Sequence, residues 1–149
     1  MANTTPEKNE ATIRTLFEDC FSRGKLELLE RLVSPDYLPD HVGARGARGQ
    51  AGFQFIVGLR AAFPDLHYHL DDLIATDDRV AVRWHWTGTH LGAFRGIAAS
   101  QKAISNSGSG IFRLREQKIV GSALETDRLG FLQQLGVVAP DEQLLPPPR

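Results

Sequence analysis

Residues 79–96 read RVAVRWHWTGTHLGAFRG, and most of the chain can be interpreted outward from them. The first half alternates strictly in polarity, and such alternation predicts a β-strand. Its apolar face holds Val80, Val82, Trp84 and Trp86. The two indoles, the only tryptophans of the protein, are two residues apart and therefore point the same way. They form either part of a dense core or the wall of an aromatic pocket.

The composition is that of an ordinary globular protein, with 149 residues of which 42% are apolar. A net charge of −1 provides no basic excess for nucleic acid or for anionic membranes. No apolar run reaches the length of a membrane span, and the polar N-terminus lacks a secretory signal. Cys20 is the only cysteine, so no internal disulfide can form. We therefore expect a cytoplasmic protein with no nucleic-acid or membrane partner.

Helices are expected before strands along the chain. Helical periodicity recurs in three early segments, residues 6–23, 25–33 and 50–62, with strand and loop expected at 36–49. Strand-like alternation follows in four segments, residues 66–75, 79–90, 101–115 and 118–126, before a last helix capped by Asp127. This order predicts one α+β domain over residues 1–149, with a core at about 6–136 and an extended tail at 137–149. A curved antiparallel sheet half-covered by helices would leave a conical cavity, where small-molecule sites are common.

Four segments carry a family resemblance: AFPDLHYHLDDLIATDDRVAVRW, GTHLGAFRGI, the KIV strand and LGFLQQLG. In this order and spacing they resemble the SnoaL-like polyketide cyclases, from about residue 16 to residue 136. Those proteins belong to the nuclear transport factor 2-like superfamily, and the resemblance implies its cone-shaped curved sheet. It also implies a hydrophobic small-molecule ligand, a homodimer through the outer sheet face, and no cofactor. The fold hosts cyclases, isomerases, epoxide hydrolases and non-catalytic binders, so the fold alone does not fix the reaction.

Most acid and base groups of the family fall on residues that cannot transfer a proton. By resemblance, the acid/base aspartate of the last strand corresponds to Leu124, and a histidine frequent in relatives corresponds to Ser122. The histidine or acid of the preceding strand corresponds to Gly110, and the oxyanion tyrosine of the isomerases corresponds to Phe17. The candidate ligand contacts are therefore Phe17, Trp84, Trp86, Gly110, Phe112, Ser122 and Leu124.

One acidic residue, Asp40, still matches a catalytic position of the related families. The isomerases carry their general base nine residues before a glycine that opens the third helix, as Asp40 precedes Gly49 here. Many SnoaL-like sequences place a histidine next, as His41 does here. Asp40 is then either a base that removes a proton α to a carbonyl or a loop aspartate with a local turn hydrogen bond. His41 is either its partner and a donor to the ligand carbonyl, or a loop histidine bonded to backbone.

Asn106 is the third candidate for a catalytic role. Its amide NH₂ can donate to a developing oxyanion, or it can be satisfied within its own strand. The next four residues read SGSG, and glycines in a strand indicate either extra cavity volume or a bulge.

His67, His69 and Asp71 share one face of a predicted strand, a spacing that metal sites can use. In an even hairpin register Asp71 lies opposite His85; in an odd one His69 and Asp71 face the tryptophans. A zinc site needs three or four convergent ligands, so we interpret this group as a polar outer face or dimer contact and expect no metal site.

Together these observations predict an enzyme that acts on a hydrophobic, carbonyl-bearing cyclic molecule of polyketide or terpenoid type. The chemistry would be metal-free acid/base catalysis leading to cyclisation or isomerisation. The alternative is a non-catalytic binding or accessory protein, or a re-engineered scaffold, in which the acid/base residues of the family are lost.

Overall fold

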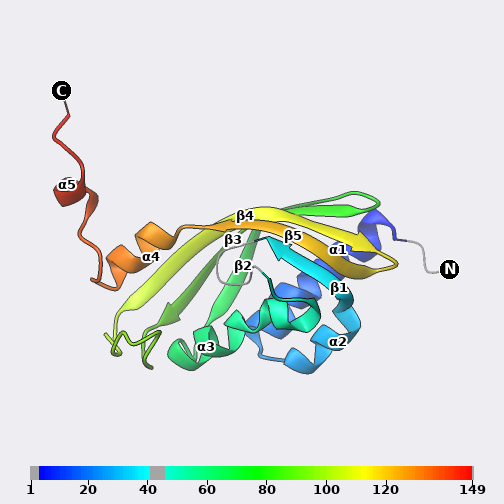
Figure 1. Ribbon diagram of the computed structural model, residues 1–149, viewed down its shortest axis with the longest axis horizontal. Coiled ribbons are helices and arrows are strands. Elements are labelled where there is room, and N and C mark those ends of the chain that lie inside the picture. The colour runs from blue at the N-terminus through cyan, green and yellow to red at the C-terminus, as the bar shows by residue number, and fades with distance from the viewer. Residues whose placement is uncertain (1–3, 41–45, 149) are drawn as a thin grey trace.

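The computed structural model describes residues 4–40 and 46–148. Within them, five strands form one curved, open sheet, and helices cover one of its faces (Figure 1). The strands are β1 (Val33–Asp40), β2 (His67–Ala75), β3 (Arg79–Thr89), β4 (Ala103–Arg115) and β5 (Lys118–Thr126). Their order in the sheet is β1-β5-β4-β3-β2. The predicted α+β class and curved sheet are confirmed.

The helices ahead of the sheet begin with a capped turn. α1 (Pro6–Thr15) starts after Thr5, whose side chain accepts a hydrogen bond from the Lys8 N–H, and it continues as a π-helical segment, Leu16–Ser22. A 3₁₀ turn, Leu26–Leu28, leads into α2 (Leu29–Leu32). Another, Gly49–Phe53, precedes α3 (Phe55–Ala62). The three predicted helices are present, but each changes its helical type along its length.

The edge strand β1 differs from the predicted antiparallel sheet. It begins at Val33, earlier than expected, and pairs in parallel with β5, so that Asp40 lies beside Ala123. The remaining strands form the expected antiparallel meander. β1 reaches the sheet from the helical layer and runs in the same direction as β5, the last strand of the meander.

A β-bulge sets the register of the β2–β3 hairpin. His69 pairs with His85 and Leu70 with Trp84, so the register is even, but it is His69 rather than Asp71 that lies opposite His85. After the bulge the pairing shifts by one, so that Asp72 pairs with Arg83. The histidines therefore lie on the face of the sheet opposite the two tryptophans.

The core lies between the helices and the inner face of the sheet. Ile13 and Leu16 of the first helix and Ile56 of α3 are fully buried there, as are Val80 of β3 and Phe112 of β4. None of the described helices is long and apolar enough to cross a membrane.

The C-terminal part begins as predicted, with α4 (Arg128–Gln134) capped by the Asp127 carboxylate, which accepts from the Gly130 N–H at 2.9 Å. The expected extended tail instead contains a short helix, α5 (Asp141–Leu144). The Gln133 amide donates to the Ala139 carbonyl oxygen at 3.0 Å and to the Asp141 carboxylate at 2.8 Å, which fixes the start of α5.

Candidate functional site

A cavity of about 570 Å³ opens between the inner face of the sheet, α3 and α4. This volume lies within the range of small-molecule sites, roughly 300–1,000 Å³. Aromatic rings from the first helix, β2, β3 and α4 form its walls. They include Phe17, Phe21, Tyr68, Trp84, Trp86 and Phe131.

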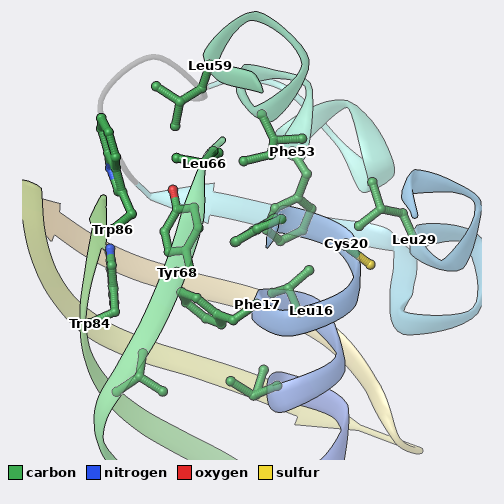
Figure 2. Close-up of a cluster of buried hydrophobic side chains, with 14 of the residues drawn as sticks. Leu16, Phe17, Cys20, Leu29, Phe53, Leu59, Leu66, Tyr68, Trp84 and Trp86 are labelled. Atoms are coloured by element: carbon green, nitrogen blue, oxygen red, sulfur yellow. The ribbon is translucent and has the colours of Figure 1, made fainter. Parts of the chain in front are cut away.

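Trp84 and Trp86 are both core residues and cavity walls. Each is 4% exposed, and both lie along β3 on the side that faces Tyr68 (Figure 2). The Trp84 ring centroid is 5.4 Å from that of Phe17, and the Trp86 centroid is 5.7 Å from that of Phe131. Such edge and tilted contacts hold the indoles in place while their remaining faces border the cavity.

Gly108 makes room for the Trp84 indole. A Cβ at this position would collide with the Trp84 ring and come within 2.8 Å of the Glu125 carbonyl oxygen. Pairing with β3 and β5 is unbroken here, so the glycine marks no bulge. The sequence indicated either extra cavity volume or a bulge at these glycines. At Gly108 the Trp84 ring occupies the space that a side chain would need.

Asn106 brings a polar group to this aromatic cavity. It is 9% exposed, and its Oδ1 atom is buried without a hydrogen-bond partner among the described residues. Buried polar atoms are nearly always hydrogen-bonded, because an unpaired one costs roughly 1–3 kcal/mol. An amide that remains unpaired at a cavity wall is a suitable contact for a polar group of a ligand.

Tyr68 provides a second polar group that sequence reasoning did not identify. It pairs with Trp86, which in turn pairs with Asn106, so the three residues form one row across β2, β3 and β4. Burial raises the pKa of Tyr68 well above its usual value, which keeps the hydroxyl protonated and able to donate. In Figure 2 the hydroxyl oxygen points away from Phe17. Only the hairpin register decides whether Tyr68 faces inward, and the sequence left that register open.

Three charged residues also line the cavity, Arg95, Glu125 and Arg128. All three are exposed, so they lie at its mouth. Arg95 belongs to the loop between β3 and β4, which is held against α3 because the Leu91 and Gly92 N–H groups both donate to the Ala62 carbonyl oxygen at 3.0 Å. The sequence indicated only a loop at Arg95 and a solvent or interface position for Glu125.

Asp40 is not among the described residues that line this cavity. Its neighbour Pro39 is buried, whereas Asp40 is exposed, as Leu38 is, and it is absent from the cavity lining. His41 lies outside the described residues. The alternation along β1 leaves Asp40 exposed, and both its expected position at the cavity mouth and its role as a base remain predictions.

Of the seven candidate ligand contacts, four line the cavity: Phe17, Trp84, Trp86 and Leu124. Gly110, Phe112 and Ser122 do not, which corrects their expected placement. A Cβ at Gly110 would collide with the Ala123 carbonyl oxygen and with Leu124, and Phe112 is fully buried in the core. The Ser122 hydroxyl forms a 2.5 Å hydrogen bond with the buried Tyr37 hydroxyl.

The outer face of the sheet carries the histidine group. The rings of His69 and His85 stack with centroids 4.5 Å apart, and Asp71 Oδ2 lies 2.8 Å from His85 Nδ1. Burial, and then the charge of His67, lower the pKa of His69. No group of three or more His, Cys, Asp or Glu within residues 4–40 and 46–148 is arranged to hold a metal ion. These side chains form a polar outer face.

Comparison with known proteins places this geometry in a family. The profile of the SnoaL-like polyketide cyclases matches residues 11–135. No curated protein matches the chain. A proposed polyketide cyclase from Acidithiobacillus ferrooxidans is 31% identical, with a TM-score of 0.77 over 89% of this chain and 96% of its own. IdmH, a proposed polyketide cyclase from Streptomyces antibioticus, is 29% identical, with a TM-score of 0.72 over 87% of this chain and 99% of its own.

A more distant structure shows the same fold. AclR, a proposed hydroxylase from Streptomyces galilaeus, is 23% identical, with a TM-score of 0.81 over 94% of this chain and 93% of its own. The profile match covers most of the chain, and the sheet, helices and cavity agree with it. The protein is a member of the SnoaL-like polyketide cyclase family.

Proposed function

We propose that the cavity binds a hydrophobic, cyclic molecule of polyketide or terpenoid type that bears a carbonyl group. The observation that carries the proposal is the Asn106 amide in a wall of aromatic rings, with its buried Oδ1 atom lacking a hydrogen-bond partner among the described residues. A primary amide both accepts and donates, so Asn106 matches a ketone with a neighbouring hydroxyl or enol. The indoles of Trp84 and Trp86 provide flat surfaces on which rings of the ligand stack.

The reaction that fits this ligand is enolate formation, leading to cyclisation or isomerisation by acid/base chemistry. Removal of a proton α to the carbonyl leaves negative charge on the carbonyl oxygen. The Asn106 N–H and the Tyr68 O–H donate to that oxygen, and such donors are strongest in a site from which water is excluded. In this scheme Asp40 is the base and His41 its partner, an assignment that rests on the sequence resemblance.

Ligand class is tested with two tricyclic probes, fluorenone and fluorene, which differ by one carbonyl group. Both tryptophans of the protein line the cavity, so intrinsic fluorescence reports its occupancy. We expect saturable quenching by fluorenone and binding about 3–10 times weaker for fluorene, the difference of one hydrogen bond. Absence of saturable binding by either probe would refute the proposed ligand class.

The second candidate is a non-catalytic binding or accessory protein. It is favoured by the cavity lining, in which Glu125, exposed at the mouth, is the one carboxylate among the described residues. Exchange of the α-protons of tetralone in D₂O, followed by NMR, separates the two candidates. Enolisation faster than in buffer, and reduced by about 10²–10⁴ in Asp40→Asn, supports the enzyme. Exchange no faster than in buffer supports the binder, and equal exchange in both proteins removes Asp40 from the mechanism.

We also propose a cytoplasmic homodimer formed through the outer sheet face. This face has no helix over it in the described structure (Figure 1). It carries exposed Arg83, Ser109 and Ile111 beside the histidines. Light scattering after size-exclusion chromatography should give twice the chain mass of 16.5 kDa. A mass of one chain at micromolar concentration would contradict the dimer.

A further inference from the structure

We propose that the ligand carries a carboxylate, and that this group stays at the cavity mouth between the guanidinium groups of Arg95 and Arg128. The inference rests on the proposed function, because it names the polar end of the same ligand. It starts from the observation that the cavity is apolar inside and charged at its opening.

Arg95 occupies a backbone position that disfavours arginine. Phe94 and Ile97 exchange two backbone hydrogen bonds, of 2.9 and 2.8 Å, around a two-residue turn. The central residues, Arg95 and Gly96, have φ values of 45° and 80°. Both are positive, as in a type I′ turn, where Asn, Asp and Gly are preferred at the first position. A bulky residue is disfavoured there because its Cβ crowds the backbone, and such strain concentrates at functional sites.

The strained turn also fixes where the arginine side chain lies. The Arg95 guanidinium carbon is 5.8 Å from the centroid of the Phe94 ring, and both residues line the cavity. Contact with an aromatic face restricts the guanidinium without neutralising it. The turn therefore holds a positive charge at the mouth.

Arg128 is the second arginine at the mouth, and it is the first residue of α4. The adjacent Asp127 carboxylate is engaged by the Gly130 N–H. Two exposed arginines, one of them in a strained backbone conformation, thus line one cavity mouth.

Neither arginine has an ion-pair partner among the described residues. With Glu125 in the same lining, the mouth carries one net positive charge. A single carboxylate balances that charge, and its planar geometry matches the donor fork of a guanidinium. The ligand class is therefore an acidic cyclic ketone, with rings against the tryptophans and the carboxylate at the opening.

The test compares fluorenone carboxylate with its methyl ester, which have the same rings and carbonyl. We expect wild-type protein to bind the acid about threefold to tenfold more tightly at low salt, because exposed ion pairs contribute roughly 0.2–1 kcal/mol each. The preference should shrink at high salt. Arg95→Gln and Arg128→Gln should each reduce the preference for the acid, and the double variant should bind acid and ester with equal affinity.

Arg115→Gln is the matched control, since it removes the same charge from an exposed position at the far end of β4. It should keep the full preference. Equal affinities of acid and ester in wild-type protein would overturn the inference that the ligand carries a carboxylate, while leaving the proposed ligand class intact. Loss of the preference in Arg115→Gln would overturn the assignment of carboxylate binding to the two arginines at the cavity mouth. Failure of both probes to bind would overturn this inference and the proposed function together.

Discussion

At the scale of single residues, Tyr37 and Ser122 form a hydrogen-bonded contact in the core. The Tyr37 ring stacks on Phe53 with centroids 4.8 Å apart, and its hydroxyl bonds to Ser122. Burial raises the pKa of Tyr37 to about 12, so the phenol stays protonated. This pair belongs to the core and leaves Asn106 and Tyr68 as the polar groups deep in the cavity.

Tyr37→Phe should lower the free energy of unfolding by about 1–3 kcal/mol, because the Ser122 hydroxyl is then buried without its partner. Urea titration measures this change. Adding Ser122→Ala should recover part of the loss, since removing both partners is nearly neutral. Fluorenone affinity should be unchanged in both variants, and a large loss of affinity would show that the pair contributes to the site.

At the scale of elements, β4 is shaped by a glycine whose role depends on the neighbouring strand. The strand would normally gain from a side chain at Gly108, because glycine costs roughly 0.5–1 kcal/mol relative to alanine. The Trp84 indole of β3 occupies the space that this side chain would need. Overpacking costs typically 1–3 kcal/mol, so steric conflict outweighs propensity here.

Gly108→Ala should therefore destabilise the protein by about 1–2 kcal/mol and displace the Trp84 indole. We expect weaker fluorenone binding and an altered tryptophan emission spectrum. Ser109→Ala is the control, because Ser109 lies next along β4 with its side chain on the exposed face. Stabilisation by Gly108→Ala, as propensity alone predicts, would contradict the packing described for Trp84.

At the scale of the whole molecule, titrating groups away from the cavity set the pH dependence of stability. Burial and the charges of His67 and His85 lower the pKa of His69, so the unfolded chain binds its proton at a higher pH than the folded protein does. The Thr89 N–H and hydroxyl, at 2.7 and 2.8 Å, lower the pKa of the Asp65 carboxylate. The hydrogen bond from His85 lowers that of Asp71.

The free energy of unfolding should thus fall in two steps as the pH is lowered. The first begins at about pH 6.5, where unfolded histidine takes up a proton, and the second at about pH 4, where unfolded aspartate does. His69→Gln should remove the part of the first step that comes from His69 and leave the second in place. Urea titrations between pH 8 and pH 3 measure both steps, and identical curves for the two proteins would contradict the role of His69.

Local periodicity predicted most of the elements, because the apolar faces of the first helix and of β3 can be recognised from residues a few positions apart in the sequence. The parallel pairing of β1, the bulge beside Asp71 and the π-helical segment could not be predicted in this way, since each depends on contacts distant in sequence. For the site, alternation was enough to place Trp84 and Trp86 on the inner face. Tyr68 was missed because its direction depends on the hairpin register. Arg95 was missed because the sequence indicated only a loop there and not the surface against which that loop packs.

The central claim is that the Asn106 amide contacts the carbonyl group of a ligand in the aromatic cavity. The most direct test is the infrared carbonyl stretch of ¹³C-labelled fluorenone bound to wild-type protein and to Asn106→Leu, which keeps the side-chain volume. We expect the wild-type band at a lower frequency than in an apolar solvent, because a hydrogen bond weakens the C=O bond. In Asn106→Leu the band should return toward the apolar value. A bound carbonyl at the same frequency in both proteins would contradict the claim.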